Sequence, residues 1–384
     1  MGTTTQIRVY TNIYSSNISF AVFSPHSLLC DARSTLKVSR VYPLNDWVKQ
    51  QVVEYFIRYL DIVRFRVIVL EDEDGFFCVL PYRTRFHSIE SVIESFNEVF
   101  DLATRSNREG VWLVITTDPA KFEEMDYLSY RYEFMKAWNR ALAWFRKKFK
   151  RVSYIAVFEF TDSGLLHIHV IFFGLKRIED AYKFMKRLED WGFGRVHYMV
   201  SIVNENGVWR PKLLSKYYHK IDNCDGAGLP RDFLLASRMG LKNYLKKYLT
   251  KTLKAVEKIN SILNSPSGTL DSILGVFQTV SRSGISQSLE ASSKDGVVSG
   301  SASTNSSIAA ALWKLAFYWA LRLRFFTYSR DLGVRVRKVK LLRYHFVGVF
   351  SVERYVVYNS YWHDWISEPT FLCFDVESIT EALF

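Results

Sequence analysis

The clearest structural signal in the chain is the segment Gly164-Leu165-Leu166-His167-Ile168-His169-Val170-Ile171-Phe172-Phe173-Gly174. A short apolar run of this kind, bounded by glycines, is typical of a buried strand. Side chains alternate between the two faces of a strand, so His167 and His169 point the same way. Two imidazoles on one face supply half of a metal site. Because a single His-x-His pair is more often structural than metal-binding, its meaning depends on its neighbours.

The residues before this strand supply a third possible ligand. The segment 162–164, Asp-Ser-Gly, is typical of a three-residue hairpin loop that ends with Gly in the left-handed region. With that loop, Glu159 pairs with His167 and shares a sheet face with both histidines, with directly opposite Cβ atoms about 5 Å apart. A two-residue turn at 163–164 would instead place Glu159 on the other face.

A set of two histidines and one carboxylate leaves coordination positions open on a metal ion. Hard divalent ions such as Mg²⁺ or Mn²⁺ fill those positions with phosphate oxygens and water. Such an ion would polarise a scissile phosphate and orient it for in-line attack. The sequence therefore predicts a divalent metal ion as cofactor, and the alternative is two structural histidines beside a surface glutamate.

A later segment of helical pattern carries two tyrosines and two lysines. Tyr244 and Tyr248 are four residues apart and share a helix face, and Lys247 and Lys251 follow each tyrosine by three. Tyrosine is a poor nucleophile at its usual pKa of about 10, but a nearby metal ion or lysine favours the phenolate. A metal ion and a tyrosine together can cut a DNA strand by forming a covalent phosphotyrosine. The alternative is an amphipathic helix with packed aromatic rings and solvated lysines.

The composition is that of a basic globular protein. The chain has 384 residues, of which 48% are hydrophobic, enough for a buried core and for two or three domains. Its formal net charge of +12 indicates a polyanionic partner, although a generally basic protein would show the same charge.

The sequence shows no signal of export and no membrane span. The cysteines are scattered without Cys-x-x-Cys spacing, which favours ordinary thiols in a reducing, cytoplasmic compartment. The N-terminus lacks the charged and apolar regions of a signal peptide. Residues 308–321 are apolar but too few for a bilayer and include Lys314, so we expect a buried helix there and no membrane partner.

The periodicity predicts an α+β fold with a central antiparallel sheet in residues 106–258. We expect strands at 111–117, 152–161, 165–173 and 195–203, and helices at 123–150 and 178–191. This order is βαββαβ, as in ferredoxin-like and RRM-like domains, with helices flanking the sheet. A further helix at 231–258 would carry the tyrosines.

Three other regions flank this core. Residues 1–105 are predicted to form an N-terminal α/β accessory region, with hairpins at 7–23 and 65–80 and helices at 47–60 and 89–102. Residues 259–307 form a linker or insert rich in Ser and Gly, expected to be flexible. Residues 308–384 form a basic, aromatic C-terminal region.

The C-terminal region opens with the apolar helix and continues with a basic stretch. Interleaved basic and aromatic residues suit contact with a nucleic-acid backbone and stacking on bases, although a run of charge is often only a solvated face. The candidate nucleic-acid contacts are Arg322, Arg324, Arg330, Arg335, Arg337 and Lys338.

The order of three motifs resembles that of the HUH endonucleases that initiate rolling-circle replication. The motifs are a strand ending in Thr116-Thr117, then His167-Ile168-His169, then the Tyr-x-x-Lys repeat at 244–251. The repeat resembles the two-tyrosine form found in replication initiator (Rep) proteins of plasmids and viruses. The resemblance covers residues 105–258.

The resemblance implies the roles of the candidate residues. His167 and His169 would bind the divalent ion with Glu159, and Tyr244 and Tyr248 would be the nucleophiles, with Tyr248 the stronger candidate for the first cut. Lys247 and Lys251 would assist. It also implies a five-stranded sheet, with the fifth strand coming from the N-terminal region or from the segment after 308.

The implied reaction leaves a 5′-phosphotyrosine link and a free 3′-OH on single-stranded DNA at a replication origin. No P-loop sequence is visible, so a host helicase and a host polymerase would be partners. Two other functions remain open. One is a transposase or relaxase with the same chemistry, and the other is a DNA-binding regulator that keeps the fold without cleavage.

Overall fold

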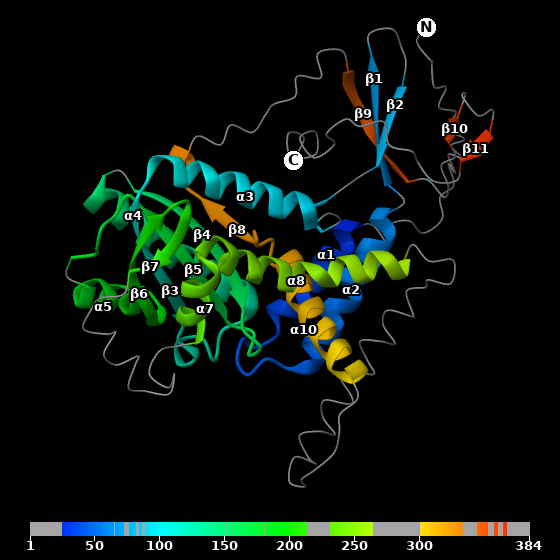
Figure 1. The fold of residues 1–384 in the computed structure, drawn as a ribbon. Helices are drawn as coiled ribbons and strands as arrows, with labels where there is room; N and C mark the ends of the chain where they lie inside the picture. The colour runs from blue at the N-terminus through cyan, green and yellow to red at the C-terminus, as the bar shows by residue number, and fades with distance from the viewer. Residues whose placement is uncertain are drawn as a thin grey trace, which may run out of the picture.

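The fold is α+β, with a six-stranded antiparallel sheet between two layers of helices (Figure 1). The predicted fold class and the central antiparallel sheet are confirmed. The structure, a computed structural model, describes residues 25–64, 66–72, 77–81, 84–86, 89–150, 152–179, 181–212, 231–263, 300–332, 344–351, 357–359 and 364–366.

The sheet has the strand order β7-β6-β3-β5-β4-β8, and every neighbouring pair is antiparallel. Its strands are β3 (Glu109–Thr117), β4 (Ser153–Phe160), β5 (Leu166–Phe173), β6 (Phe193–Glu205), β7 (Val208–Pro211) and β8 (Phe326–Tyr328). Helix α4 (Tyr127–Phe149) lies between β3 and β4 in the chain, and α5 (Ala181–Asp190) lies between β5 and β6. Strand β8 supplies the strand expected from the segment after residue 308, and β7 was not predicted.

The hairpin of β4 and β5 has the predicted register. Glu159 pairs with His167, and the Thr161 N–H donates to the Leu165 carbonyl at 2.8 Å. Gly164 has a φ of +86°, the left-handed conformation that the three-residue loop requires. The turn therefore places Glu159, His167 and His169 on one face of the sheet.

Helix α4 covers the opposite face of the sheet. The ring of Phe145 stacks on Phe172 with centroids 3.8 Å apart, and Trp138 packs edge-on against Tyr154. Helix α5 packs against α4 through Phe184. Asp126 caps the N-terminus of α4 by accepting from two backbone N–H groups, so the helix begins later than the predicted residue 123.

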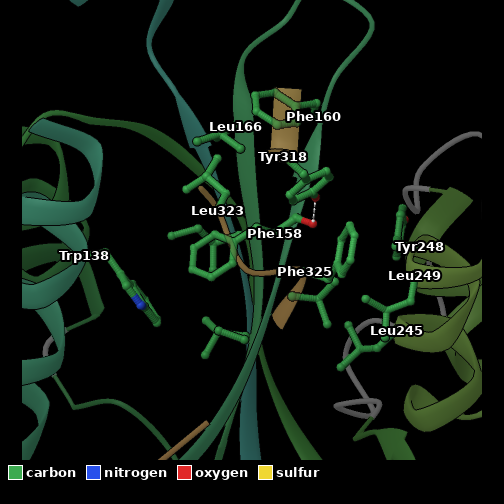
Figure 2. Packing of buried hydrophobic residues seen from close by; sticks show 14 of the residues in the cluster. Trp138, Phe158, Phe160, Leu166, Leu245, Tyr248, Leu249, Tyr318, Leu323 and Phe325 are labelled. Carbon is green, nitrogen blue, oxygen red and sulfur yellow. Dashed lines mark hydrogen bonds between the residues drawn. The ribbon is translucent and has the colours of Figure 1, made fainter. Parts of the chain in front are cut away.

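Helices α3 (Ile89–Ser106) and α8 (Leu241–Leu263) cover the face that carries the histidines. From α3, Phe100 packs edge-on against Phe173 with centroids 5.8 Å apart. From α8, Tyr244 packs edge-on against Trp112 of β3 with centroids 5.1 Å apart. Figure 2 shows the sheet between Trp138 of α4 and the α8 side chains Leu245, Tyr248 and Leu249.

Helix α10 (Gly300–Ala320) closes the β4 edge of the sheet. Strand β8 pairs only with residues 155–157 of β4. Beyond it, the Tyr318 hydroxyl donates to the Phe158 carbonyl, as Figure 2 shows. Helices α1 (Pro25–Lys37) and α2 (Asp46–Arg64) pack with α10, for example through Phe56 and Trp319.

Several elements differ from the sequence prediction. The expected single helix at 231–258 is two helices, α7 (Arg231–Met239) and α8, because Gly240 adopts a left-handed φ of +78° and ends α7. Helix α10 begins at Gly300, inside the predicted linker. Helix α1 was not predicted.

The remaining strands form two small sheets. Strand β1 (Arg66–Asp72) pairs with β2 (Phe77–Pro81), as predicted, and also with β9 (Tyr344–Ser351). Strands β10 (Val357–Asn359) and β11 (Asp364–Ile366) pair with each other. The predicted hairpin at 7–23 and residues 264–299 of the predicted linker lie outside the described residues. None of the described helices is long and apolar enough to cross a membrane.

The Gly164 turn offers a test of the hairpin register. A Cβ at Gly164 would collide with the Tyr127 hydroxyl and approach Leu44 Cδ2 to 2.8 Å. Gly207 has a similar φ of +85° but no atom within 4 Å of such a Cβ. We expect Gly164→Ala to lower the free energy of unfolding by about 2–4 kcal/mol and Gly207→Ala by only about 1 kcal/mol. Urea unfolding measures both, and equal losses would contradict the role given to the loop.

Candidate active site

The histidine face of the sheet brings together the carboxylate and one of the two imidazoles. His169 Nε2 lies 3.2 Å from Glu159 Oε2, a diagonal contact between β5 and β4. The His169 side chain is only 3% exposed and the Glu159 side chain 17%. His167 is half-buried on the same face. The strand register set by the hairpin turn therefore brings the Glu159 carboxylate into contact with the His169 imidazole in the interior. We call this pair the acid–imidazole contact.

Helix α8 places both tyrosines against this contact. The Tyr248 ring stacks on the His169 ring with centroids 4.2 Å apart and an interplanar angle of 24°. The Tyr244 ring meets His169 edge-on at 5.9 Å. The two tyrosines are one helical turn apart, so a single face of α8 presents both rings to the sheet. The candidate metal ligands and the candidate nucleophiles are thus neighbours, as the motifs suggest.

The tyrosine hydroxyls are bonded to each other. The two Oη atoms are 2.6 Å apart. Tyr244 is fully buried and Tyr248 is 9% exposed. A hydroxyl buried in an apolar setting is costly unless it is hydrogen-bonded. The pair therefore stabilises the packed position of α8, and Tyr248 is the member nearer to solvent.

The two predicted lysines lie on the outer side of α8. Lys247 is exposed, and its Nζ lies 5.5 Å from the centre of the Tyr248 ring. Lys251 is exposed too, and it is one of the cations whose charge acts on Asp162 in the β4–β5 loop. Both lysines add positive charge to this part of α8.

The donor types on this face fit a divalent metal ion. The Glu159 carboxylate and the His169 imidazole are in contact, and His167 is paired with Glu159 across the two strands. The buried Nδ1 of His169 has no hydrogen-bond partner. In the part of the chain that the structure describes, however, no three His, Cys, Asp or Glu side chains are gathered as one metal-holding group.

Helix α10 contributes two residues that sequence reasoning did not single out. Lys314 is 4% exposed, and its Nζ donates to Asp162 Oδ1 in the hairpin loop at 2.7 Å. Burial raises the pKa of Tyr318 well above its usual value, and the charge of Glu159 raises it further. Tyr318 is therefore a neutral hydroxyl beside the acid–imidazole contact. No local motif signals either residue, because both reach the site from a distant segment.

Three of the six predicted nucleic-acid contacts lie in the described part of the chain. Arg322, Arg324 and Arg330 are exposed on the chain around β8. Arg335, Arg337 and Lys338 lie outside the described residues. At the end of β3, Thr117 is buried and donates to the Leu166 carbonyl at 2.7 Å, which ties β3 to the start of β5.

The hydroxyl pair predicts a non-additive mutational effect. Tyr244→Phe and Tyr248→Phe each remove this hydrogen bond and should each lower the free energy of unfolding by about 1–2 kcal/mol. The double variant should cost about 1 kcal/mol less than the sum, because the second substitution has no bond left to break. Denaturant unfolding of the four proteins gives the coupling energy. Strict additivity would show that the two hydroxyls do not interact.

The Lys314–Asp162 contact predicts a change in acid stability. The hydrogen bond from Lys314 lowers the pKa of Asp162 below its usual value, and the charges of Lys314 and Lys251 assist. A lowered folded-state pKa gives stability that is present above about pH 4 and is lost as the pH falls through the folded value. We expect Lys314→Met to lose less stability than the parent protein on acidification from about pH 5 to 3. Lys186→Met, an exposed lysine on α5, is the control, and three identical pH profiles would contradict the expectation.

Comparisons with known proteins show which part of the chain resembles replication-associated proteins. Residues 112–222 match the family model described as Replication-associated protein ORF2/G2P. A protein of Halorubrum pleomorphic virus 1, named "Uncharacterized protein 1", is 24% identical over 314 residues, which are 76% of this chain and 51% of the relative. The chain thus spans about half the length of that relative. No solved structure matches the chain. The chain is therefore similar to replication-associated proteins over the segment that holds Glu159 and both histidines, and the tyrosines lie beyond it.

Proposed function

We propose that this protein is a site-specific single-stranded DNA endonuclease and strand transferase that initiates rolling-circle replication. The observation that carries the proposal is the stacking of Tyr248 on His169, with centroids 4.2 Å apart. It brings a potential nucleophile against the acid–imidazole contact on the sheet. Neither the tyrosine nor the acid–imidazole contact would indicate this function without the other.

Three further observations support the proposal. The match to replication-associated proteins covers the strands that carry Glu159, His167 and His169. The central part of the chain has the element order β3, α4, β4, β5, α5, β6, and its strands lie in the sheet order β6-β3-β5-β4. This arrangement suits the βαββαβ core of an HUH endonuclease. The similarity to a protein of a virus agrees with a replicon that encodes its own initiator.

The proposed reaction exchanges one phosphodiester for another. The Tyr248 oxygen attacks the scissile phosphorus and forms the Oη–P bond, while the bond from phosphorus to the 3′ oxygen breaks. The phenol proton leaves to solvent or a nearby base, and the departing 3′ oxygen takes up a proton to become a free 3′-OH. The phosphotyrosine conserves the energy of the cut, so a later attack by a 3′-OH can rejoin the strand.

Glu159, His167 and His169 would hold a divalent ion, Mg²⁺ or Mn²⁺. When bound, such an ion would polarise the scissile phosphate. Tyr318 would remain a neutral hydrogen-bond donor that fixes the β4 backbone next to Glu159. Lys247 and Lys251 would favour the phenolate and attract the phosphate by their charge.

The hydroxyl pair suggests how the two tyrosines divide the work. Tyr248 is 9% exposed and Tyr244 is not exposed, so Tyr248 is the first hydroxyl that an entering phosphate would meet. Its bond to Tyr244 must open before attack, which leaves the Tyr244 hydroxyl free for a second transfer. The partners in this proposal are single-stranded DNA at the origin, a host helicase and a host polymerase.

The decisive variant is Tyr244→Phe/Tyr248→Phe. We expect the parent protein to form a covalent adduct with single-stranded oligonucleotides of the encoding replicon in Mn²⁺ but not in EDTA. The double variant should form no adduct and should bind the same DNA within about threefold, because the ring packing is preserved. A denaturing gel with labelled DNA measures the adduct, and fluorescence anisotropy measures binding.

Tyr182→Phe is the matched control, since Tyr182 is 75% exposed on α5, which packs on α4 across the sheet from the site. It should form adduct at the parent rate. Adduct formation by the double variant at the parent rate would reject the tyrosine mechanism. Tight DNA binding without adduct in any protein would favour a regulator that binds DNA without cutting it.

A further inference from the structure

Arg131 on α4 lies within range of the charges of two arginines from distant parts of the chain. Arg33 lies on α1, Arg131 on α4 and Arg322 in the turn after α10, and α1 packs against both other helices. Arg33 and Arg131 are half-buried and Arg322 is exposed. We call these three residues the arginine cluster.

Within the described part of the chain, the arginine cluster has no paired carboxylate. The Nε of Arg131 is buried and has no hydrogen-bond partner. Among the described residues, no carboxylate forms an ion pair with any of the three guanidinium groups. Burial lowers the pKa of Arg131, and the charges of Arg33 and Arg322 lower it further. Like charges held together in a partly dry setting are unfavourable unless an anion joins them.

The backbone at Arg322 adds a second observation. Arg322 has a φ of +50°, the left-handed conformation, and its N–H donates to the Trp319 carbonyl at the end of α10. Glycine is the usual residue at this position of a helix, because a Cβ is strained there. Arg322 adopts this strained conformation although its charge adds to an already positive cluster. We therefore infer that its side chain has a function at this position.

The positive charge continues along α4 from this cluster. The chain after Arg322 pairs with the β4 edge as β8, and Ser329 exchanges two hydrogen bonds with Tyr154. Near the C-terminal end of α4 lies a hollow of about 610 Å³, and its charged lining residues are Arg146, Lys150, Arg330 and Asp331. Asp331 accepts a hydrogen bond from Ser153, so the three cations dominate the hollow.

The arginine cluster and the hollow lie near opposite ends of α4. Arg131 and Arg146 are about 22 Å apart along this helix at the usual rise per residue. That length matches several nucleotides of one strand. Arginine binds phosphate through two parallel hydrogen bonds, so a phosphate suits a group of guanidinium side chains that has no carboxylate partner among the described residues. Charge and spacing both point to a nucleic-acid backbone.

We propose that the arginine cluster binds a phosphate of single-stranded DNA and that the strand continues along α4 to the hollow at Arg146 and Arg330. The choice of single-stranded DNA rests on the proposed function. The site itself lies across the sheet from the tyrosines, because α4 and α8 cover opposite faces. It would anchor the substrate outside the reacting centre.

The test compares two charge-matched double variants. Arg131→Gln/Arg322→Gln removes two cluster arginines, and Arg105→Gln/Arg238→Gln removes two exposed arginines on α3 and α7. Fluorescence anisotropy with a labelled single-stranded 20-mer, over a series of salt concentrations, gives affinity and its salt dependence. We expect the cluster variant to bind about tenfold more weakly, with a salt slope lower by about 0.7 for each phosphate that it no longer binds. The control should match the parent protein.

Equal affinity and salt slope in the two double variants would overturn the proposal. If circular dichroism shows that the cluster variant does not fold, the affinity and salt slope of the single variant Arg33→Gln are measured instead. An arm with inorganic phosphate separates the sources of the anion. A thermal shift of the parent protein by phosphate, together with unchanged DNA affinity of the cluster variant, would identify a site for free phosphate and overturn the assignment to DNA.

The same proteins separate this proposal from the proposed function. At saturating DNA, the cluster variant should still form the covalent adduct at the parent rate, because the tyrosines are untouched. If no protein forms an adduct while the affinity difference persists, the proposed cleavage fails and the DNA site stands. If adducts form and the affinity difference is absent, the DNA site fails and the proposed cleavage stands.

Discussion

The left-handed conformation of Gly164 sets the register of β4 against β5, and the site depends on that register. A shift by one residue would move Glu159 to the opposite face, under α4. With the observed pairing, Glu159 reaches His169 at 3.2 Å, and the face it shares with both histidines receives α8. Lys314 then holds the same loop from α10 through Asp162. A short turn and one buried cation thus fix the position of the whole acid–imidazole contact.

The packing of α8 turns this contact into a candidate active site. Tyr244 packs on Trp112 and Tyr248 stacks on His169, so aromatic contacts position the rings while their hydroxyls bond to each other. Aromatic pairs of this geometry are worth about 0.5–1.5 kcal/mol each beyond the area they bury. The same forces that hold the core therefore hold the proposed nucleophiles. In the proposed reaction, a phosphate would take the place of one tyrosine hydroxyl in the pair.

Local signals made part of this arrangement predictable from the sequence. The Asp-Ser-Gly loop predicted the register of Glu159 and His167, and helical spacing predicted the shared face of Tyr244 and Tyr248. Long-range packing was not predictable. Tyr318 reaches Glu159 from a segment far along the chain, and the arginine cluster joins three helices that no motif links. Gly240 was missed as a helix break, since one glycine within a helical pattern is often tolerated.

In the proposed mechanism, Tyr248 attacks DNA from its place against His169. The most direct measurement is peptide mapping by mass spectrometry of the covalent product formed with a single-stranded origin oligonucleotide and Mn²⁺. We expect a nucleotide linked through its 5′ phosphate to Tyr248 on the first cut, with Tyr244 modified only when a second transfer follows. A nucleotide linked to a residue outside this pair, or a cleaved strand with no linked peptide, would contradict it.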